Sequence, residues 1–85
     1  MKVYVVMSNG EYYEEALVEK VFRDRKKAEA FMIKNAAIDM NELGIPSEKR
    51  YRHYFDGKLI LIAGEEKHGY RQIEWYIVES EMEEE

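Results

Sequence analysis

The sequence predicts an α+β domain, an antiparallel sheet of about five strands with one main helix packed on one of its faces. Three observations lead to this fold class. Five short runs are rich in β-branched and aromatic residues, one longer segment repeats apolar residues with the helical period, and an Asp-Gly pair joins two of the strand-like runs. The predicted order of elements is β-β-α-β-β-β, and 85 residues suffice for one such domain.

Turn residues delimit the strand-like runs. Residues 2–7 end at a Ser-Asn-Gly turn, and after an acidic loop residues 16–22 form a second run, which we expect to pair antiparallel with the first. Residues 49–55 and 58–63 flank the Asp-Gly pair, which favours the positive φ angles of a two-residue hairpin turn. Residues 71–79 form the fifth run. Its alternation places three apolar side chains on one face: Ile73, Trp75 and Ile77.

The segment between the second and third runs, residues 25–43, is the predicted helix. Asp24 is the expected N-cap, because its side chain can accept hydrogen bonds from the first free backbone amides. Gly44 suits the left-handed closing position, and Pro46 cannot continue a helix. The three basic residues that follow Asp24 lie at the positive end of the helix dipole, an unfavourable placement that needs an explanation.

Apolar residues of this helix fall into two stripes. At ~100° per residue, the stripe expected to pack on the sheet contains Ala28, Met32, Ala36, Met40 and Leu43. Phe31 and Ile38 form the other stripe. It has two explanations: loops shelter it within the core, or it is a homodimer interface of a small structural or assembly protein.

Composition favours a cytoplasmic protein. The chain has no cysteine, so it has no disulfide framework, no thiolate nucleophile and no cysteine metal site. Its longest unbroken apolar runs are five residues, against roughly 20 for a membrane span. The N-terminal segment is too short and too strand-like for a signal peptide, so we expect no membrane partner.

The excess negative charge is concentrated at the C-terminal end. The chain has 18 acidic and 13 basic residues, and five of the acidic ones lie within residues 79–85. We expect a domain over residues 1–80 and an acidic tail over residues 81–85. A local negative field can steer a basic partner, such as a DNA-binding protein whose phosphate-binding surface the acids would occupy. The residues predicted to make this contact are Glu74, Glu79, Glu81 and Glu83; a solvated tail that aids solubility is the alternative.

The segment 49–58 is the best candidate for nucleic-acid binding. It interleaves cations, which follow phosphates, with aromatic rings, which stack on bases. The candidate residues are Arg50, Tyr51, Arg52, Tyr54 and Lys58. The alternative is a hairpin strand that buries Tyr51 and Phe55 on one side and solvates its arginines on the other. A pI of about 5.1 argues against a dedicated nucleic-acid binder.

The sequence offers little for catalysis. It has two histidines, His53 and His68, and no recognisable nucleophile motif or glycine-rich phosphate loop. His68 with Glu65 and Glu66 resembles a weak metal site, but a polar tight turn explains the same residues. We therefore predict no enzyme activity, no metal and no cofactor.

Three segments of the chain resemble small uncharacterised proteins of phage and prophage genomes: residues 2–6, 21–31 and 75–79. In those proteins a strand leads through a Val-Phe step into a helix that begins with charged residues and Ala-Glu, and the last strand ends in acidic residues. The resemblance implies an α+β fold and a phage origin, with no activity attached. The resulting hypothesis is a non-catalytic protein-binding module, a modulator or inhibitor of a host protein.

Overall fold

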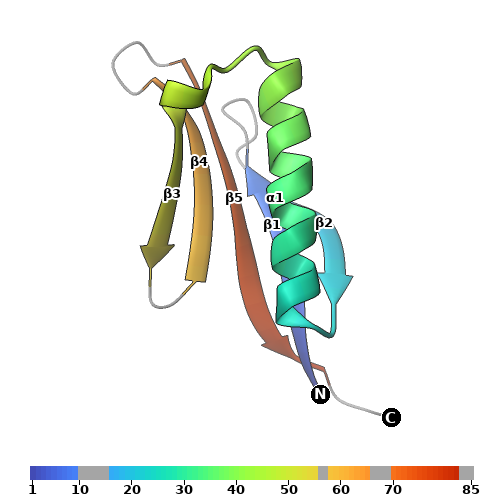
Figure 1. Ribbon diagram of the computed structural model, residues 1–85. Coiled ribbons are helices and arrows are strands. Elements are labelled where there is room, and N and C mark those ends of the chain that lie inside the picture. Colours follow the sequence, from blue (N-terminus) through green and yellow to red (C-terminus); the bar gives the residue numbers. More distant parts are fainter. Residues whose placement is uncertain (10–15, 56–57, 66–69, 83–85) are drawn as a thin grey trace.

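The computed structural model describes residues 1–9, 16–55, 58–65 and 70–82, and it confirms the predicted α+β fold (Figure 1). A five-stranded antiparallel sheet has the order β2-β1-β5-β4-β3, and one helix packs against it. The elements are β1 (Lys2–Asn9), β2 (Leu17–Phe22), α1 (Arg25–Glu42), the 3-10 turn η1 (Ser47–Lys49), β3 (Arg50–Phe55), β4 (Lys58–Glu65) and β5 (Tyr70–Glu81).

The strand β5 lies at the centre of the sheet, although it comes last in the chain. One of its edges pairs with β1, from Lys2 opposite Glu81 to Asn9 opposite Glu74. Its other edge pairs with β4. Because β1 also pairs with β2 and β4 with β3, β5 joins two antiparallel strand pairs into one sheet.

Three strands end two residues later than predicted: β1 at Asn9, β4 at Glu65 and β5 at Glu81. β5 extends through Glu81, and the Met82 amide donates a hydrogen bond to the Met1 carbonyl at 2.8 Å. The boundary predicted at residue 80 therefore falls inside a paired strand. β3 and β4 pair antiparallel up to Phe55 opposite Lys58, as the Asp-Gly pair predicted. The turn itself and the acidic loop lie outside the described residues.

Both predicted caps of α1 are confirmed. Asp24 Oδ1 accepts hydrogen bonds from the backbone amides of Lys26 and Lys27 at 2.8 and 3.3 Å. At the other end Gly44 has a φ of 68°, its amide donates to the Asn41 carbonyl, and the Ile45 amide donates to the Met40 carbonyl. These two bonds define a Schellman motif, which satisfies carbonyls that the helix end leaves free.

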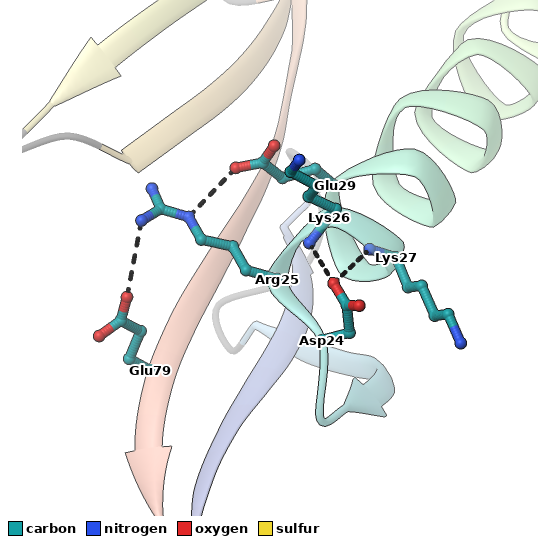
Figure 2. A network of polar contacts seen from close by, with 6 residues as sticks. All are labelled: Asp24, Arg25, Lys26, Lys27, Glu29 and Glu79. Carbon is teal, nitrogen blue, oxygen red and sulfur yellow. Dashed lines mark hydrogen bonds and ion pairs between the residues drawn. The ribbon is translucent and has the colours of Figure 1, made fainter.

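Acidic side chains near Arg25 compensate part of the unfavourable basic charge in the first turn of α1. Arg25 Nε donates to Glu29 Oε1 at 3.2 Å, one turn along the helix (Figure 2). Arg25 Nη1 also lies 3.9 Å from Glu79 Oε1 on β5 (Figure 2). The guanidinium therefore links the first turn of the helix to the central strand, and these two carboxylates offset its unfavourable interaction with the helix dipole.

The core lies between α1 and the sheet. The helix contributes Ala28, Met32, Ala36 and Met40, and the strands contribute Val6, Leu59, Leu61, Ala63, Ile73, Trp75 and Ile77. The indole Nε1 of Trp75 donates to Asp39 Oδ2 on the helix at 3.4 Å. The prediction that Leu43 belongs to the buried stripe is wrong. Leu43 is exposed because it is the C-cap, where the chain turns away from the helix.

Replacing Asp24 with alanine should lower the free energy of unfolding by about 1 kcal/mol, because two backbone amides lose their acceptor. Urea denaturation followed by circular dichroism measures the change. Asp24→Asn keeps a capping oxygen and should retain most of the stability. Equal losses in both variants would show that the cap is not the cause.

Gly44→Ala should also lower the free energy of unfolding, by about 1 kcal/mol. No heavy atom lies within 4 Å of the added Cβ, so the loss comes from the left-handed φ of 68° and not from a clash. Gly44→Asn, which tolerates this φ better, should lose less in the same urea titration. A larger loss for asparagine than for alanine would contradict this explanation.

Candidate functional site

The sheet has one face covered by α1 and one face that no helix of the described chain covers (Figure 1). The pairing registers assign side chains to these two faces, because paired residues point to the same side. We name the uncovered side the open face. Its described members are Val3, Val5, Met7, Asn9, Val18, Val21, Tyr51, His53, Lys58, Ile60, Ile62, Glu74, Tyr76, Val78 and Ser80.

Apolar residues form rows across the open face. Val5 pairs with Val21 on one side and with Val78 on the other, so one row contains three valines. The next row runs from β2 to β5 and contains Val18, Met7 and Tyr76. On the other half of the sheet, the register places Ile60 and His53 in the row of Tyr76, and Ile62 and Tyr51 in the row of Glu74.

The open face is strongly apolar for a surface in contact with solvent. Val18, Val21 and Val78 are 61%, 48% and 41% exposed, and Val5, Met7 and Tyr76 in the middle strands are partly exposed. Val3, at the end of β1, is buried. Among the described residues of this face, Lys58 and Glu74 carry the only formal charges, whereas 36% of the whole chain is charged. A contiguous apolar patch of this kind marks an interaction surface more often than a free one.

The acidic residues predicted to bind a basic partner do not share one face. Glu74 belongs to the open face, whereas Glu79 and Glu81 lie on the helix side of β5. Lys2 Nζ and Arg25 Nη1 each lie 3.9 Å from Glu79, and the Met1 amine lies 3.6 Å from Glu81. Cations of the same chain thus offset part of this negative charge. Glu83 lies outside the described residues.

The residues of the candidate nucleic-acid segment are also divided between the two faces. By register, Arg50, Arg52 and Tyr54 lie on the helix side, and Tyr51 and Lys58 on the open face. Tyr51 is 48% exposed and Tyr54 is 74% exposed, so the expected burial of Tyr51 does not occur. These two rings cannot stack on bases along one side of the sheet.

Arg50 has a structural role within the chain. Its Nε and Nη2 donate to the Ile45 carbonyl at 2.9 and 2.6 Å, and Nη2 also donates to Asn41 Oδ1 at 2.7 Å. These bonds hold the segment after α1 against the start of β3. The guanidinium of Arg50 therefore binds groups of its own chain, whereas the nucleic-acid hypothesis requires it to bind phosphate.

The two residues of the second helical stripe lie in different environments. Phe31 packs against Phe22 of β2 with ring centroids 5.3 Å apart, and Lys20 Nζ lies 5.4 Å from the Phe31 centroid. Ile38, two turns further along α1, is 46% exposed. Phe31 thus extends the core, whereas Ile38 is exposed on the outer side of the helix.

A shallow groove of about 220 Å³ separates the second half of α1 from β3 and β4. Its lining includes Ile33, Ala36, Met40, Arg52 and Leu61. The groove exists because α1 packs over β1, β2 and β5 and reaches β4, which leaves the helix side of β3 uncovered (Figure 1).

Within the described part of the chain, no cluster of three or more His, Asp or Glu side chains is suitable for a metal ion. His53 lies on the exposed edge strand β3. Two of the three residues of the weak metal site suggested by the sequence, His68 and Glu66, lie outside the described residues. The structure offers no helix among the described residues that is long and apolar enough to cross a membrane.

Fold and surface together define a class, an α+β domain with a helix on one sheet face and an apolar open face on the other. Comparisons with known proteins found no matching family model, no matching curated protein and no matching solved structure.

The open face is the feature that sequence reasoning missed, although the sequence contains its signal. A sheet with a helix on one side needs only one apolar face, which gives strict alternation in its strands. Residues 3–7 and 59–63 are instead apolar at every position. Such unbroken runs are typical of strands that are covered on both faces.

Arg50→Ala should lower the free energy of unfolding by about 1–2 kcal/mol, because it removes charge-assisted hydrogen bonds to the Ile45 carbonyl. Arg52→Ala, on the same strand, is the matched control and should change stability by less than ~0.5 kcal/mol. Thermal and urea unfolding of both variants measure the difference. Equal effects would contradict the structural role of Arg50.

Proposed function

We propose that this protein is a non-catalytic protein-binding module whose open face is covered by another protein chain in its working state. The apolar open face is the observation that carries the proposal. Val78 and Val21 lie across the sheet from Val5 in one apolar row. Removing such side chains from water stabilises an association by about 25 cal/mol per Å² of apolar surface.

The free energy gained by burying apolar side chains must offset the cost of association. Fully burying one valine, isoleucine or methionine side chain contributes about 1.5–3 kcal/mol relative to exposure, and the open face offers several that are partly exposed. Association costs an estimated 4–15 kcal/mol in lost translational and rotational freedom. Because these side chains are already partly buried in the free chain, each contributes only part of this amount, and a stable complex must cover many residues of the open face.

The acidic end of β5 suggests how a partner is steered to the module. The Glu81 side chain is 73% exposed, and it lies on the same side of the strand as Glu79. Exposed carboxylates raise the association rate with a basic protein more than they raise its affinity. The resemblance to small phage and prophage proteins fits a module of this kind that occupies a surface on a host protein.

Single-stranded nucleic-acid binding has weaker support. Arg50 is engaged in hydrogen bonds within the chain, and Tyr51 and Tyr54 lie on opposite faces of β3. A binding surface for an oligonucleotide requires its cations and rings along one path. The open face, by contrast, has its apolar residues in adjoining rows.

Val78→Lys tests the proposal, with Ile38→Lys as the matched control. The two side chains are 41% and 46% exposed, one on the open face and the other on the outer side of α1. Each variant is used as bait against a host lysate, and captured proteins are identified by mass spectrometry. We expect a defined protein partner to be retained by the wild type and by Ile38→Lys, and to be lost with Val78→Lys, because a charge now faces an apolar surface.

Two results would contradict the proposed function. One is equal loss of the captured partner in both variants, which would show a general effect of added lysine. The other is a wild-type chain that captures no protein and shows no self-association. Circular dichroism of each variant confirms that the fold is intact before the comparison is made.

The double substitution Glu79→Gln, Glu81→Gln should slow association with a basic partner several-fold at low salt and flatten its salt dependence, because it removes the exposed acidic charge at the end of β5. Surface plasmon resonance at two ionic strengths measures both rates. The dissociation rate should change little. An unchanged association rate would contradict the electrostatic steering.

A further inference from the structure

We propose that the chain covering the open face is a second copy of this protein, so that two sheets pack face to face with their helices on the outside. The inference rests on the proposed function, since it names the partner of the same surface. The homodimer is symmetric, and β5, the middle strand of each sheet, lies at the centre of the interface.

The layer arrangement is the first argument. One copy has two layers, α1 and the sheet, and no helix or strand of the described residues covers the second face of the sheet (Figure 1). Two copies related by a two-fold axis give the order helix, sheet, sheet, helix, in which every apolar sheet face is covered. Sheets that pack in this way lie ~10 Å apart, with side chains of the two inner faces interdigitated.

The size of the open face is the second argument. Five strands spaced ~4.8 Å apart span ~24 Å across the sheet, and three paired rows of side chains extend ~20 Å along it. The projected area is then roughly 500 Å² for one copy and roughly 1,000 Å² for two, which reaches the lower limit of specific interfaces. The accessible area is larger than this projected area, because side chains project from the sheet.

Charge is the third argument, because the described side chains of the open face have no net charge, although the chain has a net charge of −5. The two charges among these described residues, on Lys58 and Glu74, are of opposite sign. The acidic residues Glu79 and Glu81 lie on the helix side of β5, and so they would face outward in the dimer. Two copies can therefore approach through this face without bringing their excess acidic charge together.

The positions of the two charges also suit a two-fold axis. Glu74 of β5 pairs with Ile62 of β4. In the same register, Lys58 of β4 lies level with Val78, which is four residues after Glu74 along β5. Tyr76 lies midway between the two levels. Consider a two-fold axis that lies between the two sheets, runs perpendicular to the strands and passes the level of Tyr76. This axis brings Lys58 of one copy near Glu74 of the other, twice per dimer.

The solution mass of the purified wild-type chain tests the inference. Light scattering coupled to size exclusion, over at least a hundredfold range of concentration, should give twice the chain mass of 10.2 kDa and a decrease on dilution. Val78→Lys should give a monomer with unchanged circular dichroism, and Ile38→Lys should remain a dimer. If Val78→Lys does not fold, Val21→Lys on the edge strand β2 replaces it.

The charge pair provides a second measurement. Lys58→Glu and Glu74→Lys should each weaken dimerisation by about tenfold, because each places like charges at two symmetric positions. The double variant with both exchanges restores opposite charges and should recover most of the lost affinity. A dimer that tolerates both single changes, or that is broken by Ile38→Lys and not by Val78→Lys, would use another surface and would overturn the inference.

The outcomes separate this inference from the proposed function. A monomeric wild type that captures a different protein, lost with Val78→Lys, overturns the homodimer and leaves the binding module in place. A monomeric wild type with no captured partner overturns both. A dimer that depends on Val78 and not on Ile38 supports both.

Discussion

A single helix cannot cover a five-stranded sheet, and most features of this protein depend on that constraint. The 18 residues of α1 make a rod about 27 Å long and roughly 10 Å wide, whereas the sheet spans ~24 Å across its strands. The helix therefore covers one face of β1, β2 and β5 and reaches β4. Within the described part of the chain, no helix covers the groove beside β3 or the opposite face of the sheet.

Much of this architecture could be predicted from local chemistry. Asp24, Gly44 and the Asp-Gly pair marked element ends, because caps and tight turns require particular backbone angles and acceptors. The buried stripe of α1 followed from its period. Strand order was not accessible in the same way: nothing local in residues 70–81 shows that this segment lies between β1 and β4, since that position results from pairing between distant parts of the chain.

The candidate sites were harder to predict for the same reason. Side chains that are close in sequence on a strand point to alternate faces, so the compact basic and aromatic segment is divided between two surfaces. The acidic residues of β5 likewise alternate between the two faces. Lys2 and Arg25, which are distant from Glu79 in sequence, offset part of its charge. Segregation of charge along a chain is thus a poor guide to segregation in space.

The central position of β5 sets the order in which this protein can fold during synthesis. The inner edges of β1 and β4 have no strand to pair with until the last described strand leaves the ribosome. Until then the two strand pairs are separate, and each exposes apolar surface and unpaired backbone groups. Closing the sheet requires contacts between the first and last strands, which makes folding slower than in a helical chain of equal length. The nascent chain is thus most prone to aggregation in the interval just before β5 docks.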